Sequence, residues 1–181
     1  MKFVYFIATF IIITSCSDAN RSGYLSEVDQ IISTIDSMEV VIDGLDFNPI
    51  LSMMETSDEI EQKLMLLNID TIPLELALEI DRCLHAISKG EVLMYNVELL
   101  KTQLLDNQEL IESLKQDISE DNGHRERYEE YVQFEKEKVE ELRVTLGGYT
   151  ETMETVLDVN EESITSVIEI LDERIAAIEV Q

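Results

Sequence analysis

The chain lacks tryptophan and has only two prolines and six glycines among its 181 residues. So few helix-breaking residues leave few obligatory interruptions, which permits long helices. Hydrophobic residues make up 45% of the chain, so enough apolar surface is present for a core and a disordered acidic polymer is excluded. Leu, Ile, Val, Glu and Asp dominate, and this composition predicts an all-α protein.

Basic residues are also scarce. Thirteen Lys and Arg stand against 39 Asp and Glu, which gives a formal net charge of −26. A polyanion repels phosphates, so nucleic-acid binding is excluded. Residues 22–62 contain ten acids and residues 144–173 contain eight, and neither segment has a Lys or Arg. Such segments predict solvated helix faces, or a surface for a basic partner or for divalent cations.

Cysteine occurs only twice, as Cys16 and Cys83. Cys16 ends the segment MKFVYFIATFIIITSC, in which one lysine precedes a short apolar core. This core is shorter than the about 20 residues that span a bilayer. The pattern is therefore typical of an export signal. Its end, Ile13-Thr14-Ser15-Cys16, resembles the lipobox of bacterial lipoproteins.

That resemblance implies cleavage before Cys16, lipids such as palmitate on Cys16, and a place in the bacterial cell envelope, foremost at the outer membrane. The expected organisation is a signal peptide over 1–15, a lipidated cysteine and short tether over 16–23, and a single acidic helical domain over 24–181. Two alternatives stay open: cleavage after Ser17, which would release a soluble secreted or periplasmic protein, and an uncleaved N-terminal anchor. With Cys16 lipidated, Cys83 has no disulfide partner and is expected to be a small buried apolar residue.

Apolar spacing along the rest of the chain is helical. Residues 74–89 are apolar around most of their circumference, which predicts a helix near the centre of the domain that stops at Gly90. Thr56 and Glu59 have the spacing of a capping box, and Gly147-Gly148 is expected to end another helix. The predicted helices cover residues 24–42, 56–67, 74–89, 91–120, 128–146 and 151–180, with room for a short helix after Pro49.

The segments 91–120 and 128–146 have the most regular pattern, a 3.5-residue apolar repeat typical of coiled-coil packing. Asp121-Asn122-Gly123 between them predicts a turn, so an antiparallel hairpin is favoured over one continuous helix. Asn107 and Asn160 each interrupt an apolar seam. A buried Asn can set helix register. The alternatives are that each faces solvent or bonds to the backbone.

Tyr128, Tyr131 and Phe134 recur at three-residue steps beside Arg125 and Arg127. Aromatic residues and arginines are enriched at the energetic centres of protein interfaces, so these five are the candidate partner surface. The alternative is that Tyr128 and Tyr131 pack on a neighbouring helix with their hydroxyls at the rim. The arginines could also pair with the acidic first or last helix.

The chain contains no complete catalytic or metal motif. Cys83 and His85 are two apart, which places them on different sides of a helix. Residues 158–169 partly imitate an EF-hand loop, but Ser163 stands where that loop needs glycine. No metal site, cofactor or catalytic residue is therefore expected, although surface carboxylates could bind calcium weakly.

The sequence thus predicts an all-α, elongated helical bundle with antiparallel coiled-coil-like helices. The expected function is non-enzymatic: a lipid-anchored envelope protein that binds a protein partner or itself through helical surfaces. Three alternatives remain: an immunity-like neutraliser of a basic periplasmic effector, a protein that binds cations or a basic ligand, and an enzyme of an unrecognised kind.

Overall fold

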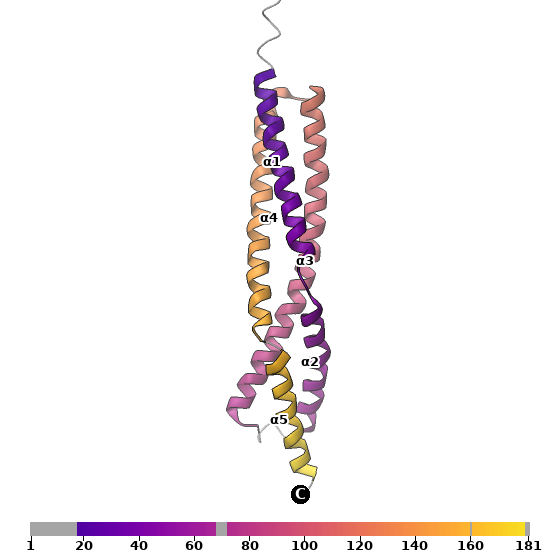
Figure 1. Cartoon of the computed structure of the whole chain (residues 1–181), viewed down its shortest axis with the longest axis vertical. Helices are drawn as coiled ribbons and strands as arrows, with labels where there is room; N and C mark the ends of the chain where they lie inside the picture. The colour runs from indigo at the N-terminus through magenta and orange to yellow at the C-terminus, as the bar shows by residue number, and fades with distance from the viewer. Residues whose placement is uncertain (1–17, 68–71, 160, 180–181) are drawn as a thin grey trace, which may run out of the picture. The chain divides into compact units, whose positions relative to one another are not determined.

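The computed structural model describes residues 18–67, 72–159 and 161–179, and all regular structure within them is helical (Figure 1). The expected signal peptide over 1–15 and Cys16 lie outside these residues. The prediction of an all-α protein is confirmed for the described part. Its elements are α1 (Asp18–Asp43), α2 (Asn48–Leu66), α3 (Leu74–Glu120), the short 3-10 helix η2 (Arg125–Arg127), α4 (Tyr128–Leu157) and α5 (Glu161–Glu179).

The chain forms two compact units. Unit 1 contains α1 as far as Val40 together with Thr102–Arg143, and unit 2 contains Val41–Lys101 and the residues from Val144 onward. Three helices, α1, α3 and α4, therefore contribute residues to both units. The reason is their length: a helix of 47 residues such as α3 has more turns than one compact core can cover.

Unit 1 is built from three helices whose apolar stripes face one another. The predicted stripe of α1 is buried, and so are the predicted seams of α3 and α4. Lys115 of α3 bonds to Asp29 of α1 at 2.7 Å, and Lys136 of α4 lies 3.8 Å from Glu27 of α1. The buried side chains include Val28, Ile31, Ile35, Leu104, Ile111, Ile118, Val132 and Val139.

The turn between α3 and α4 has the conformation that its sequence predicts. Gly123 and Asp121 have positive φ angles of 78° and 64°, which glycine and aspartate tolerate better than most residues. The backbone N–H of Asn122 donates to the backbone carbonyl oxygen of Asp117 at 2.9 Å, and this bond closes the end of α3. The α3–α4 hairpin is thereby confirmed, and the continuous helix is wrong (Figure 1).

Helix α1 begins earlier than predicted, at Asp18 rather than near Tyr24, so most of the expected tether over 16–23 is helical. A Cβ at Gly23 would meet no atom within 4 Å, so this glycine adds only its helix-propensity cost of about 1 kcal/mol. The Tyr24 ring packs edge-on against Tyr128 at a centroid distance of 6.3 Å, which fixes the first turns of α1 on unit 1.

In unit 2, α2 is one helix from Asn48 to Leu66, and the predicted break at Thr56 is wrong. The Thr56 hydroxyl donates to the Ser52 carbonyl at 2.8 Å, a bond within the helix rather than a cap. Pro49 occupies the first turn, where its missing N–H costs nothing. Helix α2 packs along α5, and Lys63 of α2 forms an ion pair with Asp172 of α5.

Two predicted helix ends are also wrong, because tertiary packing overrides the glycines. Helix α3 continues through Gly90, which is buried where a Cβ would lie 2.6 Å from Cγ2 of Ile50 and 3.4 Å from Cγ1 of Val156. Helix α4 continues through Gly147-Gly148, since Leu146 and Met153 hold both sides of that segment in the core. Helix α4 ends instead at Leu157, and α5 begins at Glu161. The single helix predicted over 151–180 is therefore divided between α4 and α5.

Candidate functional site

One of the five residues of the predicted aromatic and arginine surface is buried. Tyr128 is only 5% exposed, and its hydroxyl donates to the carbonyls of Asp117, at 3.1 Å, and of Asn122. Burial raises the pKa of Tyr128, and the nearby carboxylates of Asp121 and Asp117 raise it further. Tyr128 therefore closes the hairpin and belongs to the core, as the alternative interpretation predicted.

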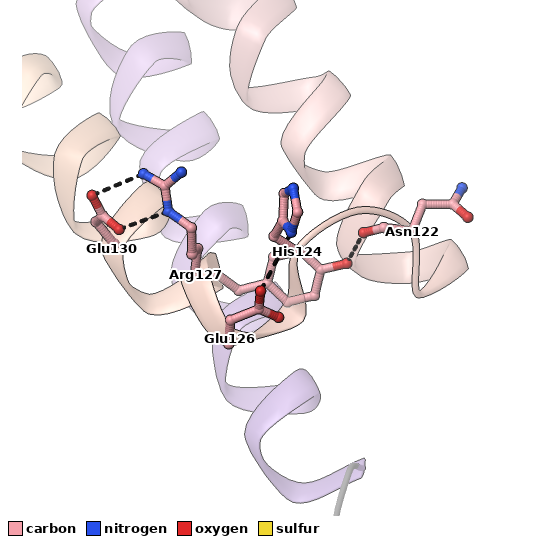
Figure 2. A network of polar contacts seen from close by, with 6 residues as sticks. Asn122, His124, Glu126, Arg127 and Glu130 are labelled. Carbon is pink, nitrogen blue, oxygen red and sulfur yellow. Dashed lines mark hydrogen bonds and ion pairs between the residues drawn. The ribbon is translucent and has the colours of Figure 1, made fainter.

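Both arginines bind acids close to them in sequence. Arg125 forms an ion pair with Asp121, and the Arg127 Nε lies 3.0 Å from Oε2 of Glu130 (Figure 2). The Arg127 guanidinium lowers the pKa of Glu130. It also lies 4.8 Å from the centre of the Tyr131 ring, within cation–π range. Of the five predicted residues, only Phe134 presents a bare apolar side chain, 61% exposed.

Asn107 lies in the apolar seam of unit 1, as its spacing predicted, and it is buried. Its Nδ2 donates to the Gln103 carbonyl at 2.6 Å, which is the backbone bond named as the alternative. Its Oδ1 has no hydrogen-bond partner among the described residues. Asn160 lies outside the described residues.

A second apolar stripe runs along α3 within unit 2, on a side that the core does not cover. Its residues are 47% to 74% exposed, so the prediction that residues 74–89 are buried on most sides is wrong. Its residues occupy positions of a 3.5-residue repeat in two groups, residues 74–78 and 92–99, and the repeat positions between them hold the polar Asp81, His85 and Ser88. We call it the α3 stripe; it consists of Leu74, Leu78, Val92, Tyr95 and Leu99.

A groove follows α1 and α4 in unit 1, and we call it the α1/α4 groove. Two adjoining hollows form it and share Glu27 and Gln133. Buried Ile31, Val132 and Val139 make its floor. One lysine, Lys136, lines it together with an acidic set: Glu27, Glu126, Glu129, Glu130, Glu137, Glu140 and Glu141. Six of these acids lie together in residues 126–141 and were visible in the sequence, whereas the pairing of α1 with α4 adds Glu27 and creates the groove.

The cysteine and the two histidines in the described part of the chain do not form a common site. Cys83 is fully buried and has no disulfide partner among the described residues, and burial raises the pKa of its thiol. His85 and His124 are both exposed, and His124 lies 3.3 Å from Glu126 (Figure 2). Within the described ranges, no three His, Cys, Asp or Glu side chains converge as metal ligands would.

Comparison with protein-family models, curated proteins and solved structures finds no match to this chain. In the part of the chain that the structure describes, no helix combines the length and the apolar character needed to cross a membrane.

Proposed function

We propose that this protein is a non-enzymatic, lipid-anchored component of the bacterial cell envelope that binds another protein, or a second copy of itself, through its helical surfaces. The lipobox-like segment ending at Cys16 supports the anchor. The α3 stripe supports the binding role and is the observation on which the proposal depends most.

The α3 stripe supports protein binding because it exposes apolar side chains at helix-packing spacing on one side of α3. Its five side chains form two groups, Leu74 with Leu78 and residues 92–99, separated on the same face by polar residues, and each of the five is exposed by 47% or more. Soluble proteins scatter single apolar side chains over their surfaces, whereas Val92, Tyr95 and Leu99 follow one another at the three- and four-residue steps typical of a packing face. Covering Leu78, Val92 and Tyr95 with a helix would remove their apolar area from water at about 25 cal/mol per Å².

The anchor is tested by growing cells with a tagged fatty acid. Wild type and the Cys83→Ala variant are expected to incorporate the label, and Cys16→Ala is expected to lose it. Cys83→Ala is the matched control because it also removes one cysteine. Equal labelling of Cys16→Ala and wild type would contradict the lipid anchor.

The binding role is tested with a photo-crosslinking amino acid at Tyr95 in intact cells. The matched control carries the same group at Glu61, which is exposed on α2 of the same unit. We expect a discrete adduct from position 95 that is absent from position 61 and is lost on Val92→Lys. An adduct of twice the chain mass identifies self-association. The absence of an adduct specific to position 95 would contradict the proposal.

A further inference from the structure

We propose that the α3 stripe binds a second copy of this chain, with the two α3 helices antiparallel about a two-fold axis midway between His85 and Ser88. This inference rests on the proposed function, because it concerns the same surface, and it names the partner and its orientation. The order of apolar and polar residues along α3 within unit 2 supports it.

The exposed side of α3 has a nearly symmetric order of residues. Eight positions follow one 3.5-residue repeat, and the side chains at all eight are exposed; we call them the α3 seam. Apolar residues occupy the two ends of the α3 seam, and polar residues occupy its middle. In chain order the α3 seam consists of Leu74, Leu78, Asp81, His85, Ser88, Val92, Tyr95 and Leu99.

Antiparallel pairing matches this order. An axis midway between residues 86 and 87 would place Leu74 level with Leu99 of the second copy, and Leu78 level with Tyr95 of the second copy. The apolar end of each helix would thus cover the opposite apolar end of the other, and the polar residues would meet in the middle. A two-fold interface requires this kind of self-complementarity, in which each contact between two positions occurs twice.

Asp81 favours the antiparallel orientation. In a parallel pair it would face Asp81 of the second copy inside the seam, where two like charges shielded from water repel. In the antiparallel pair it faces Val92 of the second copy instead. The flanks that carry Arg82 and Lys89 would then lie near each other. Both side chains are exposed and Arg82 already lies 3.5 Å from Glu79 of its own helix, so this repulsion is small.

The middle of the α3 seam adjoins a hollow that suits an acidic partner. The hollow has a volume of about 350 Å³ and lies between α3 and the α4 residues Tyr149, Thr152 and Thr155 of unit 2. His85 and Lys89 line it, and none of the described residues that line it is acidic, although acids outnumber Lys and Arg by 39 to 13 in the chain. A second copy, with its net charge of −26, therefore meets less repulsion here than on an acidic face.

The α3 seam is long enough for a helix pair. From Leu74 to Leu99 it spans about 38 Å at 1.5 Å per residue, or about seven turns. Each copy contributes five apolar side chains that are 47% to 74% exposed. Polar residues within a seam specify the pairing at a cost in stability, so we expect a reversible dimer rather than a permanent one.

Cross-linking between two positions tests the orientation. One purified full-length chain carries Asp81→Cys and another carries Val92→Cys, each with Cys16→Ala and with the buried Cys83 retained. The antiparallel pair places the two new cysteines level, whereas identical cysteines lie 11 residues apart, or about 16 Å along the axis. With a bifunctional thiol reagent shorter than this separation, the mixture should cross-link at least about tenfold faster than either chain alone. The chain with Cys83 alone is the control.

Sedimentation of the purified full chain tests the seam itself. Asp81→Leu should tighten the dimer about tenfold, because Val92 of the second copy gains an apolar contact in place of a carboxylate. Glu61→Leu is the matched control, since it also replaces one acid by leucine at an exposed position of unit 2. It should change the dissociation constant less than about threefold. Tyr95→Lys should weaken the dimer at least about tenfold.

Four results separate this inference from the proposed function. Cross-linking of identical cysteines without cross-linking in the mixture would overturn the antiparallel orientation. Equal effects of Asp81→Leu and Glu61→Leu would overturn the seam, because they indicate a general effect of charge. A monomer at all concentrations, together with a Tyr95 photo-adduct of a different mass, would refute self-association and leave the proposed function standing. A monomer without any adduct specific to Tyr95 would refute both.

Discussion

Gly90 of α3 lies against Ile50 of α2 so closely that a Cβ at position 90 would come within 2.6 Å of the Ile50 Cγ2 methyl. Ile50 is fully buried and β-branched, so this methyl cannot rotate away without disturbing the core of unit 2. Gly90 therefore serves close packing between two helices.

Gly90→Ala is expected to lower the free energy of unfolding by about 1–2 kcal/mol, because overpacking exceeds the gain in helix propensity. Gly147→Ala is the matched control: Gly147 is also within a helix, and its Cβ would meet nothing within 4 Å. That substitution should raise stability by about 0.5–1 kcal/mol. Urea unfolding followed by circular dichroism measures both, and equal effects at the two sites would contradict the close packing.

Asn107→Leu is expected to raise the free energy of unfolding by about 1–2 kcal/mol, since it removes a buried carbonyl oxygen that lacks a partner and restores the apolar seam. Thermal unfolding of wild type, Asn107→Leu and Asn107→Ala measures this. If Asn107 sets register, the leucine variant should also lose helix alignment or change oligomeric state in sedimentation. A leucine variant that is less stable than wild type would show that the amide contributes more than its burial costs.

Tyr128 should make stability fall at high pH. Its folded pKa is raised above the unfolded value near 10, so the unfolded chain loses the phenolic proton first. The contribution is fully present below the unfolded pKa and disappears as pH rises through the folded pKa. Tyr128→Phe should lower stability at pH 7 by about 1 kcal/mol through its lost hydrogen bonds. In the same variant, the free energy of unfolding should fall less steeply above pH 10 than in wild type, as measured by denaturant unfolding. An equally steep fall in both proteins would contradict the raised pKa of Tyr128.

Cys83 is expected to resist thiol reagents in the folded protein, because its side chain is buried and its thiol pKa is raised. In a Cys16→Ala background, its reaction with an aromatic disulfide should proceed only as fast as the protein opens, and denaturant should accelerate it. The control is Ser52→Cys in a chain without the two native cysteines, since Ser52 is exposed on α2. Equal rates at positions 52 and 83 would contradict the burial of Cys83.

Predictions from periodicity succeeded where one helix face was clearly apolar. The stripes of α1 and of the α3–α4 hairpin are buried as predicted, because repeated apolar spacing specifies which face leaves water. Predictions from single residues at helix ends failed at Thr56, Gly90 and Gly147. A glycine lowers helix stability by only about 1 kcal/mol, and packing over many turns exceeds that.

The candidate site was harder to predict than the fold. Tyr128 and Phe134 have similar spacing from Tyr131, yet one is in the core and the other is exposed. Which of the two side chains is buried depends on the position of α1, since Tyr24 of α1 packs against Tyr128. The α3 stripe was visible as a pattern, but its exposure could be known only once the neighbouring helices were placed.

By itself the sequence determined the all-α fold, the acidic character and the hairpin at Gly123, because composition, heptad spacing and turn residues act locally. Only the tertiary structure decided that Gly90 lies inside a helix, that Asn107 is buried, that α3 exposes apolar side chains, and that Glu27 of α1 lines one groove with acids of α4. Each of these depends on which helices lie side by side, and that is set by the summed burial of many side chains rather than by any short segment.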